Sequence, residues 1–442
     1  MTANAHKTYF IRTFGCQMNE HDSGRMAGLL EGLGYEKAPA LEEADILLIN
    51  TCSVREKPYH KAISEAGRAR AFKTKRGALI GVCGCVAQQE GAKIIERYGH
   101  VDFVFGPDQI AKLPEMIEAA RQGRHAVATG FIDDPDDPNL PHAVADGEVT
   151  GGSAFVAIMK GCNCSCAYCI VPSVRGPEVS RSADDIVKEV KSVVARGAKE
   201  VTLLGQNVNA YGRGTDTNFV ELLKRIASET DALRIRYTSP HPKDVTDEVI
   251  ELYRSEKKLC PHIHLPVQAG SNAVLKTMRR GYTREKIFEQ VDKLREARPD
   301  IAITTDMIVG FCGESESDFQ DTIDLMKRVR FDSMFAFCYS TRPGTYAADK
   351  MDDDVPLAEK KARLEEVLKL QRAIQGDANA KLVGKDVDVL VTGADAKNEG
   401  KLTGRAGDNR LIHFAGNADL IGSIVRVHIT KGSMHSLQGE MK

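Results

Sequence analysis

The sequence has no long apolar run. No apolar stretch approaches the ~18 residues of a membrane-spanning helix, and residues 1–7 (MTANAHK) lack the hydrophobic core of a secretory signal. These absences argue against the membrane-spanning and secreted classes, so we expect a cytoplasmic protein with no membrane partner. Tryptophan is also absent, which by itself excludes no fold or function.

The sequence also lacks an excess of charge of either sign. Its 60 lysines and arginines face 62 aspartates and glutamates, which gives a formal net charge of -2. A nucleic-acid partner would therefore have to meet a local basic face. The 442 residues, 42% of them hydrophobic, are enough for two or three domains.

Cysteine is well represented. There are 11 cysteines, an odd number that fits metal or redox ligands better than a disulfide framework. Cys162, Cys166 and Cys169 form a C-x3-C-x2-C array after an apolar strand-like run. Iron–sulfur clusters are held by cysteine thiolates, often closely spaced. A four-iron cluster with three such ligands would keep one iron open, as a catalytic zinc site keeps one position for water or substrate.

Zinc is the alternative metal for this array. A structural zinc site would need a second cysteine or histidine pair downstream, and Cys260, Cys312 and Cys338 are isolated in the sequence. Cys164, inside the array, is either a bystander that packs as a small hydrophobe or a competitor for the open iron.

The first third of the chain repeats one unit three times: a buried-strand pattern, a cysteine and a helical pattern. Strands are expected at residues 7–13, 44–50, 78–82 and 101–105, and helices after 19 to about 33, from about 55, after 88, and at 109–121. This alternation predicts a parallel α/β sheet.

The cysteines of these units fall where strands end. Ligands gather at the carboxyl ends of parallel strands, so Cys16, Cys52 and Cys85 should converge on one point. The alternative is three unconnected cysteines in ordinary turns. Cys83 is expected to share a strand face with Cys85 and is the better candidate for a bystander.

Residues 131–152 are acidic and rich in proline and glycine, which predicts a linker. Strand patterns then recur at residues 155–159, 200–204, 233–237, 262–265, 301–309 and 333–339. Helical patterns separate them, which predicts a partial parallel (β/α)6 barrel whose active face is formed by the loops after the strands. A long charged helix is expected from residue 352 to about residue 380.

The last part of the chain changes to short alternating strands. They are expected at residues 387–392, 400–406, 411–414, 423–429 and 434–438, and predict a small β-barrel of the kind that binds nucleic acid. Its charges are close to balanced, and its basic residues include those at positions 381, 385, 401, 405, 410, 426 and 431. The alternative is a solubilising cap. The expected division is residues 1–130, a linker at 131–152, a core at 153–380 and a barrel at 381–442.

Several of these motifs resemble those of known families. C-x3-C-x2-C followed by an apolar pair is the signature of the radical S-adenosylmethionine enzymes. Residues 15–19 (GCQMN), 50–55 (NTCSVR) and 84–88 (GCVAQ) are similar to turns in the amino-terminal domain of the methylthiotransferases, and the final strands resemble their RNA-binding TRAM domain. The resemblance covers nearly the whole chain. It departs at Cys164, where the family usually has no cysteine, and at Cys312, where it has proline.

The resemblance implies three cofactors. One four-iron four-sulfur (4Fe-4S) cluster would be the radical-generating cluster, on Cys162, Cys166 and Cys169. A second, auxiliary 4Fe-4S cluster would be held by Cys16, Cys52 and Cys85. S-adenosyl-L-methionine would bind the open iron of the first cluster, and its candidate contacts at the strand ends are Tyr168, Gln206 and Asn207.

The implied activity is that of a transferase that methylthiolates C2 of isopentenyl-adenosine in the tRNA anticodon loop. Such an unpaired base can be splayed out into a pocket, and its C–H needs a cofactor with radical chemistry. Residues 205–211 and 238–242 look most like this branch. Sibling branches act on threonylcarbamoyl-adenosine or on a ribosomal-protein aspartate, and an alternative from another class is an iron–sulfur electron-transfer protein with an RNA-binding tail. The expected partners of a monomer are tRNA, an electron donor such as flavodoxin or ferredoxin, and a sulfur or cluster supplier.

Overall fold

The computed structural model describes residues 7–53, 56–134, 137 and 148–442. The chain forms two compact units. The first comprises Met1–Glu148, Met159–Cys164 and Ile170–Ser182, and the second comprises Val149–Ile158, Ser165–Cys169 and Ala183–Lys442. Most of the predicted linker, residues 135–136 and 138–147, lies outside the described residues.

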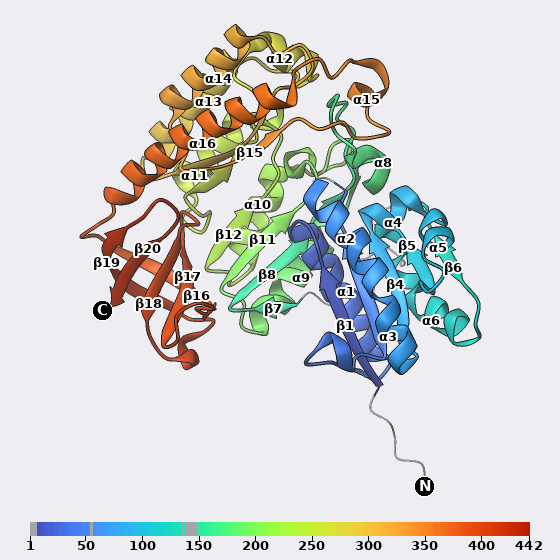
Figure 1. Ribbon diagram of the computed structural model, residues 1–442. Helices are drawn as coiled ribbons and strands as arrows, with labels where there is room; N and C mark the ends of the chain where they lie inside the picture. Colours follow the sequence, from blue (N-terminus) through green and yellow to red (C-terminus); the bar gives the residue numbers. More distant parts are fainter. Residues whose placement is uncertain (1–6, 54–55, 135–136, 138–147) are drawn as a thin grey trace. The chain divides into compact units, whose positions relative to one another are not determined.

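The first unit is built on a six-stranded parallel sheet, as the sequence predicts (Figure 1). Its strand order is β2 (Tyr35–Lys37), β1 (Lys7–Thr13), β3 (Ile46–Thr51), β4 (Leu79–Gly84), β5 (Phe103–Phe105) and β6 (Ala126–Ala128). The edge strands β2 and β6 were not predicted, because three residues are too few to establish a period.

Both faces of this sheet are covered by helices, which explains the continuous apolar run of β3. Ile46 and Leu48 pack under α1 (Gln17–Gly32) and α6 (Leu113–Arg121). Leu47 and Ile49 point to the opposite face, since successive side chains of a strand alternate. The helices of that face are α2 (Glu56–Arg68), α3 (Arg70–Arg76), α4 (Cys85–Glu90) and α5 (Lys93–Arg97).

Two details of the first unit differ from expectation. The helix expected over residues 109–121 is a 3-10 helix, η2 (Pro107–Lys112), followed by α6, because the backbone of Gln109 is not helical. Cys83 does not share a strand face with Cys85: β4 ends at Gly84, so Cys85 is already the first residue of α4. Cys83 instead packs in the core beside Met26.

The second unit contains the six predicted parallel strands in chain order. β8 (Ser153–Ala157), β11 (Glu200–Leu204) and β12 (Arg234–Tyr237) form one run, and β13 (His262–His264), β14 (Ala302–Val309) and β15 (Ser333–Cys338) form another. A parallel bridge from Ile235 to Leu259 continues the first run toward the second. The helices between and after the strands are α9 (Ala183–Ala195), α10 (Phe219–Glu229), α11 (Asp247–Ser255), α12 (Asn272–Thr277), α13 (Arg284–Ala297), α14 (Glu316–Val329), α15 (Tyr346–Lys350) and α16 (Leu357–Ala380).

Three boundaries in this region differ from the sequence reading. The strand expected over residues 155–159 ends at Ala157, and β9 (Met159–Lys160) instead pairs antiparallel with β10 (Val179–Ser180) in the first unit. The end of the predicted linker is a short strand, β7 (Val149–Thr150), antiparallel to β8. The long helix begins at Leu357 because Pro356 caps it in an extended conformation.

The final strands close into a five-stranded barrel, as predicted. The barrel order is β16 (Asp386–Ala394), β17 (Lys401–Ala406), β18 (Leu411–Ala415), β20 (Leu437–Met441) and β19 (Ile424–Gly432). The strand expected at 434–438 begins three residues later, because Ser433 and Ser436 form a hydrogen-bonded turn before it.

Two arginines of β12 hold this barrel against the rest of the second unit. Arg234 donates to the carbonyl oxygens of Asp388 and Arg405 at 2.8 and 3.1 Å. Arg236 donates to the Gly407 carbonyl at 3.1 Å and forms a buried ion pair with Glu200. Among the helices of the described residues, none has the length and hydrophobicity of a membrane span.

Candidate metal-binding cysteines

Cys16, Cys52 and Cys85 meet at one end of the first sheet. Cys16 precedes α1, Cys52 follows β3 and Cys85 opens α4, and their strands β1, β3 and β4 are neighbours. The Cys16 and Cys52 thiols are within hydrogen-bonding reach of each other, and Cys85 is close enough to Cys16 for their charges to interact. The structure therefore brings the three predicted ligands together.

A buried polar network joins the three turns that carry these cysteines. The Asn19 amide donates to Asn50 Oδ1 at 3.0 Å and to the Thr51 carbonyl at 2.8 Å. The Thr51 hydroxyl donates to the Cys83 carbonyl at 2.5 Å and accepts from the Val86 backbone N–H at 3.2 Å. Asn19, Asn50 and Thr51 are fully buried, so the relative placement of the turns is fixed by satisfied hydrogen bonds.

The glycines before Cys16 and Cys85 allow this approach. Gly15 has φ +140°, and a Cβ there would lie 2.7 Å from Cys52 Cβ. Gly84 has φ +87°, and a Cβ there would lie 2.4 Å from Asn50 Oδ1. Both contacts are too short for any residue with a side chain, and both backbone conformations favour glycine.

The electrostatics of this end of the sheet favour a thiolate at Cys16. The pKa of Cys16 is lowered to about 6, first by the hydrogen bond with Cys52 and further by the positive charge of Arg175. Burial raises the pKa of Cys85, while Arg175 acts in the opposite direction. Three convergent sulfurs next to a buried guanidinium suit an anionic metal–sulfur group, because metal-bound cysteine is deprotonated. The donor set therefore fits an iron–sulfur cluster.

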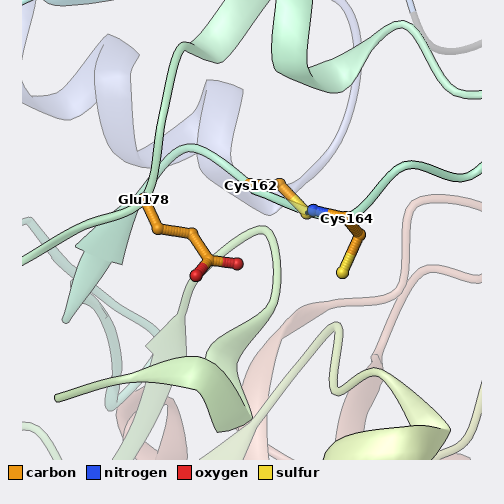
Figure 2. A group of neighbouring side chains, drawn as sticks. All are labelled: Cys162, Cys164 and Glu178. Atoms are coloured by element: carbon orange, nitrogen blue, oxygen red, sulfur yellow. The ribbon is translucent and has the colours of Figure 1, made fainter. Parts of the chain in front are cut away.

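The C-x3-C-x2-C array begins in the first unit. Cys162 is buried and its N–H donates to the Gly176 carbonyl at 3.1 Å. Asn163 and Glu178 exchange two hydrogen bonds of 3.1 Å, each through its side chain to the backbone N–H of the other. Figure 2 shows Cys162, Cys164 and Glu178 grouped beside this loop, with one ligand atom of each within 4.8 Å of the others. Glu178 was not foreseen near the array, and its pairing with Asn163 folds the loop.

Cys166 and Cys169 belong to the second unit. Arg280 donates from Nη1 to Cys166 Sγ at 3.1 Å, and His241 Nε2 lies 3.9 Å from the same sulfur. The Cys169 N–H donates to the Cys166 carbonyl at 3.1 Å, which gives this end of the array a tight turn. Polar donors therefore surround the Cys166 sulfur, as they surround sulfurs in iron–sulfur sites.

His241 is a neutral donor in this group. Its Nδ1 accepts from the Lys243 N–H at 3.3 Å, so the hydrogen is assigned to Nε2, on the side of Cys166. Its pKa is lowered to about 2 by burial first and then by the positive charges of Arg280, Lys243 and Arg213.

The predicted S-adenosylmethionine contacts differ in their surroundings. Asn207 is 1% exposed, and its amide donates to Asp244 Oδ2 at 2.8 Å and accepts from the His241 N–H at 3.2 Å. It therefore joins the loops after β11 and β12. Gln206 is half-buried on the same loop. The Tyr168 ring packs edge-on against Phe311, and burial raises the pKa of its hydroxyl.

The loop after β14 is closed by a buried carboxylate. Glu314 accepts from the Gly310 N–H at 2.5 Å and from Arg363 of α16 at 2.8 Å. Cys312, where the family has proline, is buried in a cluster with Phe311 and Tyr339. The cysteine side chain fills apolar space at this position.

Sequence reasoning missed the charged and polar partners of the cysteines. Arg175 and Arg280 lie outside the predicted motifs, whereas Asn19, Asn50 and His241 lie within motifs but were assigned no role. The available signal was weak: Arg175 is a single charge in the apolar segment 170–175, and Arg280 follows another arginine.

Comparisons with known proteins agree with this architecture. Residues 156–326 match the Radical SAM superfamily, residues 8–106 match a family described as Uncharacterized protein family UPF0004, and residues 380–442 match the TRAM domain. Among solved structures, the radical S-adenosylmethionine methyltransferase TsrM from Kitasatospora setae has a TM-score of 0.57 at 14% identity, covering 78% of this chain and 74% of that one. This likeness concerns the fold.

The fold and the cysteine array define a radical S-adenosylmethionine protein. Relatives that match nearly the whole of this chain narrow the assignment to one family of such enzymes. A tRNA-2-methylthio-N(6)-dimethylallyladenosine synthase from Geobacter metallireducens is 48% identical over 98% of both chains. One from Anaeromyxobacter dehalogenans is 47% identical over 98% of this chain and 94% of its own. The chain belongs to the family of these synthases.

Proposed function

We propose that this protein methylthiolates C2 of N6-dimethylallyl-adenosine (isopentenyl-adenosine) in the tRNA anticodon loop, as a cytoplasmic enzyme. The observation that carries the proposal is the near full-length match to relatives named for this product. The convergence of Cys16, Cys52 and Cys85 supports it, because sulfur insertion calls for a second metal–sulfur site in addition to the radical array.

The proposed ligands form two sets. Cys162, Cys166 and Cys169 would hold the radical-generating 4Fe-4S cluster. Cys16, Cys52 and Cys85 would hold the auxiliary 4Fe-4S cluster. When bound, these clusters and S-adenosyl-L-methionine supply one-electron chemistry at an unreactive C–H bond and a source of sulfur.

The chain's own residues orient and insulate these groups. Arg280 and His241 donate toward the Cys166 sulfur, and the neutral state of His241 keeps that donor in place across the physiological pH range. Asn207, tied to Asp244 and His241, gives shape to the loops proposed to contact S-adenosylmethionine, with Gln206 and Tyr168 beside them. Buried, satisfied side chains of this kind hold a site in one geometry.

The proposal includes three macromolecular partners. The closed barrel of β16–β20 is proposed to bind tRNA, because small barrels of this kind present strands and loops to oligonucleotides. A low-potential electron donor such as flavodoxin or ferredoxin would reduce the radical cluster, and a sulfur or cluster supplier would replace the sulfur lost in each turnover.

The test is nucleoside mass spectrometry of tRNA from cells that lack the protein. Accumulation of isopentenyl-adenosine without its methylthio group is expected, and unchanged methylthiolation would refute the proposal. Loss of methylthio groups from threonylcarbamoyl-adenosine would point to the sibling branch. An anaerobic assay for 5′-deoxyadenosine with dithionite separates the enzyme from an electron-transfer protein, which would release none.

A further inference from the structure

A buried arginine of the first unit lies beside the convergent cysteines. Arg175 ends α8 (Val171–Arg175) and is 6% exposed. Its Nη2 lies 2.8 Å from Oδ2 of Asp22, which is 3% exposed. The two side chains therefore form a buried ion pair.

The surroundings place this guanidinium next to two of the proposed ligands. Ile170, which precedes α8, and Val174, within α8, pack against Cys85. Arg175 is close enough to Cys85 and Cys16 for its charge to interact with theirs. Burial would lower the pKa of the guanidinium, whereas Asp22 first, and then Cys85 and Cys16, raise it. Helix α8, which contributes no proposed cluster ligand, therefore places a fixed positive charge beside the cysteines.

Asp22 lies next to two further buried residues of its own helix, α1. His21 Nδ1 lies 3.6 Å from Asp22 Oδ1, and Arg25 Nε donates to His21 Nε2 at 3.4 Å. Because Nε2 accepts, the imidazole hydrogen is assigned to Nδ1, facing the carboxylate. Arg25, His21 and Asp22 are all buried residues of α1, the helix that begins directly after Cys16.

A buried charge of this kind needs a counterpart. An isolated ion pair of Arg175 and Asp22 would be costly to bury, since desolvation often exceeds the attraction within the pair. A cluster held by three thiolates is anionic and gains negative charge when it is reduced. A guanidinium beside the cluster would offset that charge, and net charge and hydrogen bonds to sulfur are what set the potentials of such clusters.

We propose that Arg175, held by Asp22, is a positioning residue that compensates the charge of the auxiliary cluster on Cys16, Cys52 and Cys85 and raises its reduction potential. The inference rests on the proposed function, because it requires that cluster. It assigns Asp22 the opposite effect: the carboxylate fixes the guanidinium but partly cancels its field.

The test uses the full chain with Cys162, Cys166 and Cys169 replaced by alanine, so that only the auxiliary cluster is loaded. The midpoint potential is followed by electron paramagnetic resonance during an anaerobic redox titration. Arg175→Met is expected to shift the potential downward and Asp22→Asn to shift it upward. Arg175→Lys, which keeps the charge but not the planar fork, is expected to fall between Arg175→Met and the parent.

The opposite signs separate electrostatics from simple damage to the fold. Lys73→Met is the matched control: it removes a partly buried cation of the same unit that pairs with Asp102, and it should leave the potential unchanged. If Arg175→Met does not hold the cluster, the Asp22→Asn and Arg175→Lys shifts still decide. The inference would be overturned if Asp22→Asn shifted the potential in the same direction as the Arg175 variants, or if none of these variants shifted it. A parent protein that binds no iron would instead refute the proposed function.

Discussion

Arg280 donates a hydrogen bond from Nη1 to the sulfur of Cys166 across 3.1 Å. The guanidinium is 4% exposed and is also anchored by the Pro266 carbonyl and the Tyr282 hydroxyl, both at 2.9 Å. In each unit, therefore, a buried arginine accompanies proposed cluster ligands: Arg175 in the first and Arg280 in the second. The two differ in their anchors, because Arg280 is held by neutral oxygens and Arg175 by a carboxylate.

Replacing Arg280 with methionine should weaken the radical-generating cluster. The change removes the donor to Cys166 and leaves a buried carbonyl less well satisfied. Loss of such partners commonly costs about 10- to 100-fold in metal affinity or activity. Iron retained during anaerobic dialysis against a chelator would be measured in a chain with Cys16, Cys52 and Cys85 replaced by alanine.

The neighbouring Arg279 provides the control for this experiment. It is exposed and stacks on the Tyr346 ring at 3.4 Å instead, so Arg279→Met should retain iron as the parent does. Equal retention by Arg280→Met and Arg279→Met would show that the contact with Cys166 is unimportant.

The free energy of unfolding should decrease as the pH is lowered below about 6.5, because His241 is buried in its neutral form. The unfolded chain protonates this histidine near pH ~6.5, whereas the native pKa is about 2, lowered mainly by burial. The unfolded state then binds the extra proton, so stability is fully present above that pH and is lost as pH falls, by about 1.4 kcal/mol per pH unit. Burial also lowers the pKa of His262, which adds a slope of the same sign.

His241→Asn should remove its own share of this slope. Thermal unfolding of the cluster-free protein would be followed from pH 7 to pH 5.5 for both proteins. The variant should lose less stability than the wild type over that range, although it starts from a lower value. Parallel curves would mean that His241 is protonated in the native state or is not buried.

Cys164→Ser should preserve both iron content and activity. Cys164 is 8% exposed, and its backbone N–H donates to the Cys162 sulfur at 3.4 Å. A hydroxyl in place of the thiol costs about 1–3 kcal/mol if it is left unpaired, which lowers stability but removes no ligand. Cys162→Ser is the matched comparison and should lose the radical-generating cluster. Loss of activity in a folded Cys164→Ser protein would give Cys164 a part in the chemistry.

The strands were the most predictable feature of this chain. β11 has the predicted bounds Glu200–Leu204, because Val201, Leu203 and Leu204 give this short segment an apolar strand pattern. The short edge strands and the 3-10 helix η2 were missed, since three to six residues carry no period. The start of β20 was misplaced because two serines make the preceding turn, which composition alone does not reveal.

The candidate site was predictable only in part. The end of a parallel strand is a recognisable place, so the meeting of Cys16, Cys52 and Cys85 could be anticipated. Their partners could not, because Arg175 reaches Cys85 from more than 80 residues away in sequence and Arg280 reaches Cys166 from 114 residues away. Such approaches depend on how the chain folds back, and a single arginine in the sequence gives no sign of them.

The barrel offers a direct test of tRNA binding through Lys385 and Lys431. The Ile429 N–H donates to the Lys385 carbonyl at 2.9 Å, so the two lysines lie near each other at the same end of β16 and β19. Both are exposed, and neither forms an ion pair within the described part of the chain. Of the other basic residues, Arg410 pairs with Asp332 and Arg426 with Asp388, so these two are less available for phosphate.

Replacing both lysines with alanine should therefore weaken tRNA binding and make it less dependent on salt. Each lost phosphate contact lowers the slope of log K against log salt by about 1. Filter binding at several salt concentrations would measure both effects. Lys188→Ala with Lys191→Ala, which removes two exposed charges from α9, is the control and should change neither. If the two double variants weaken binding equally, net charge rather than the barrel accounts for the affinity.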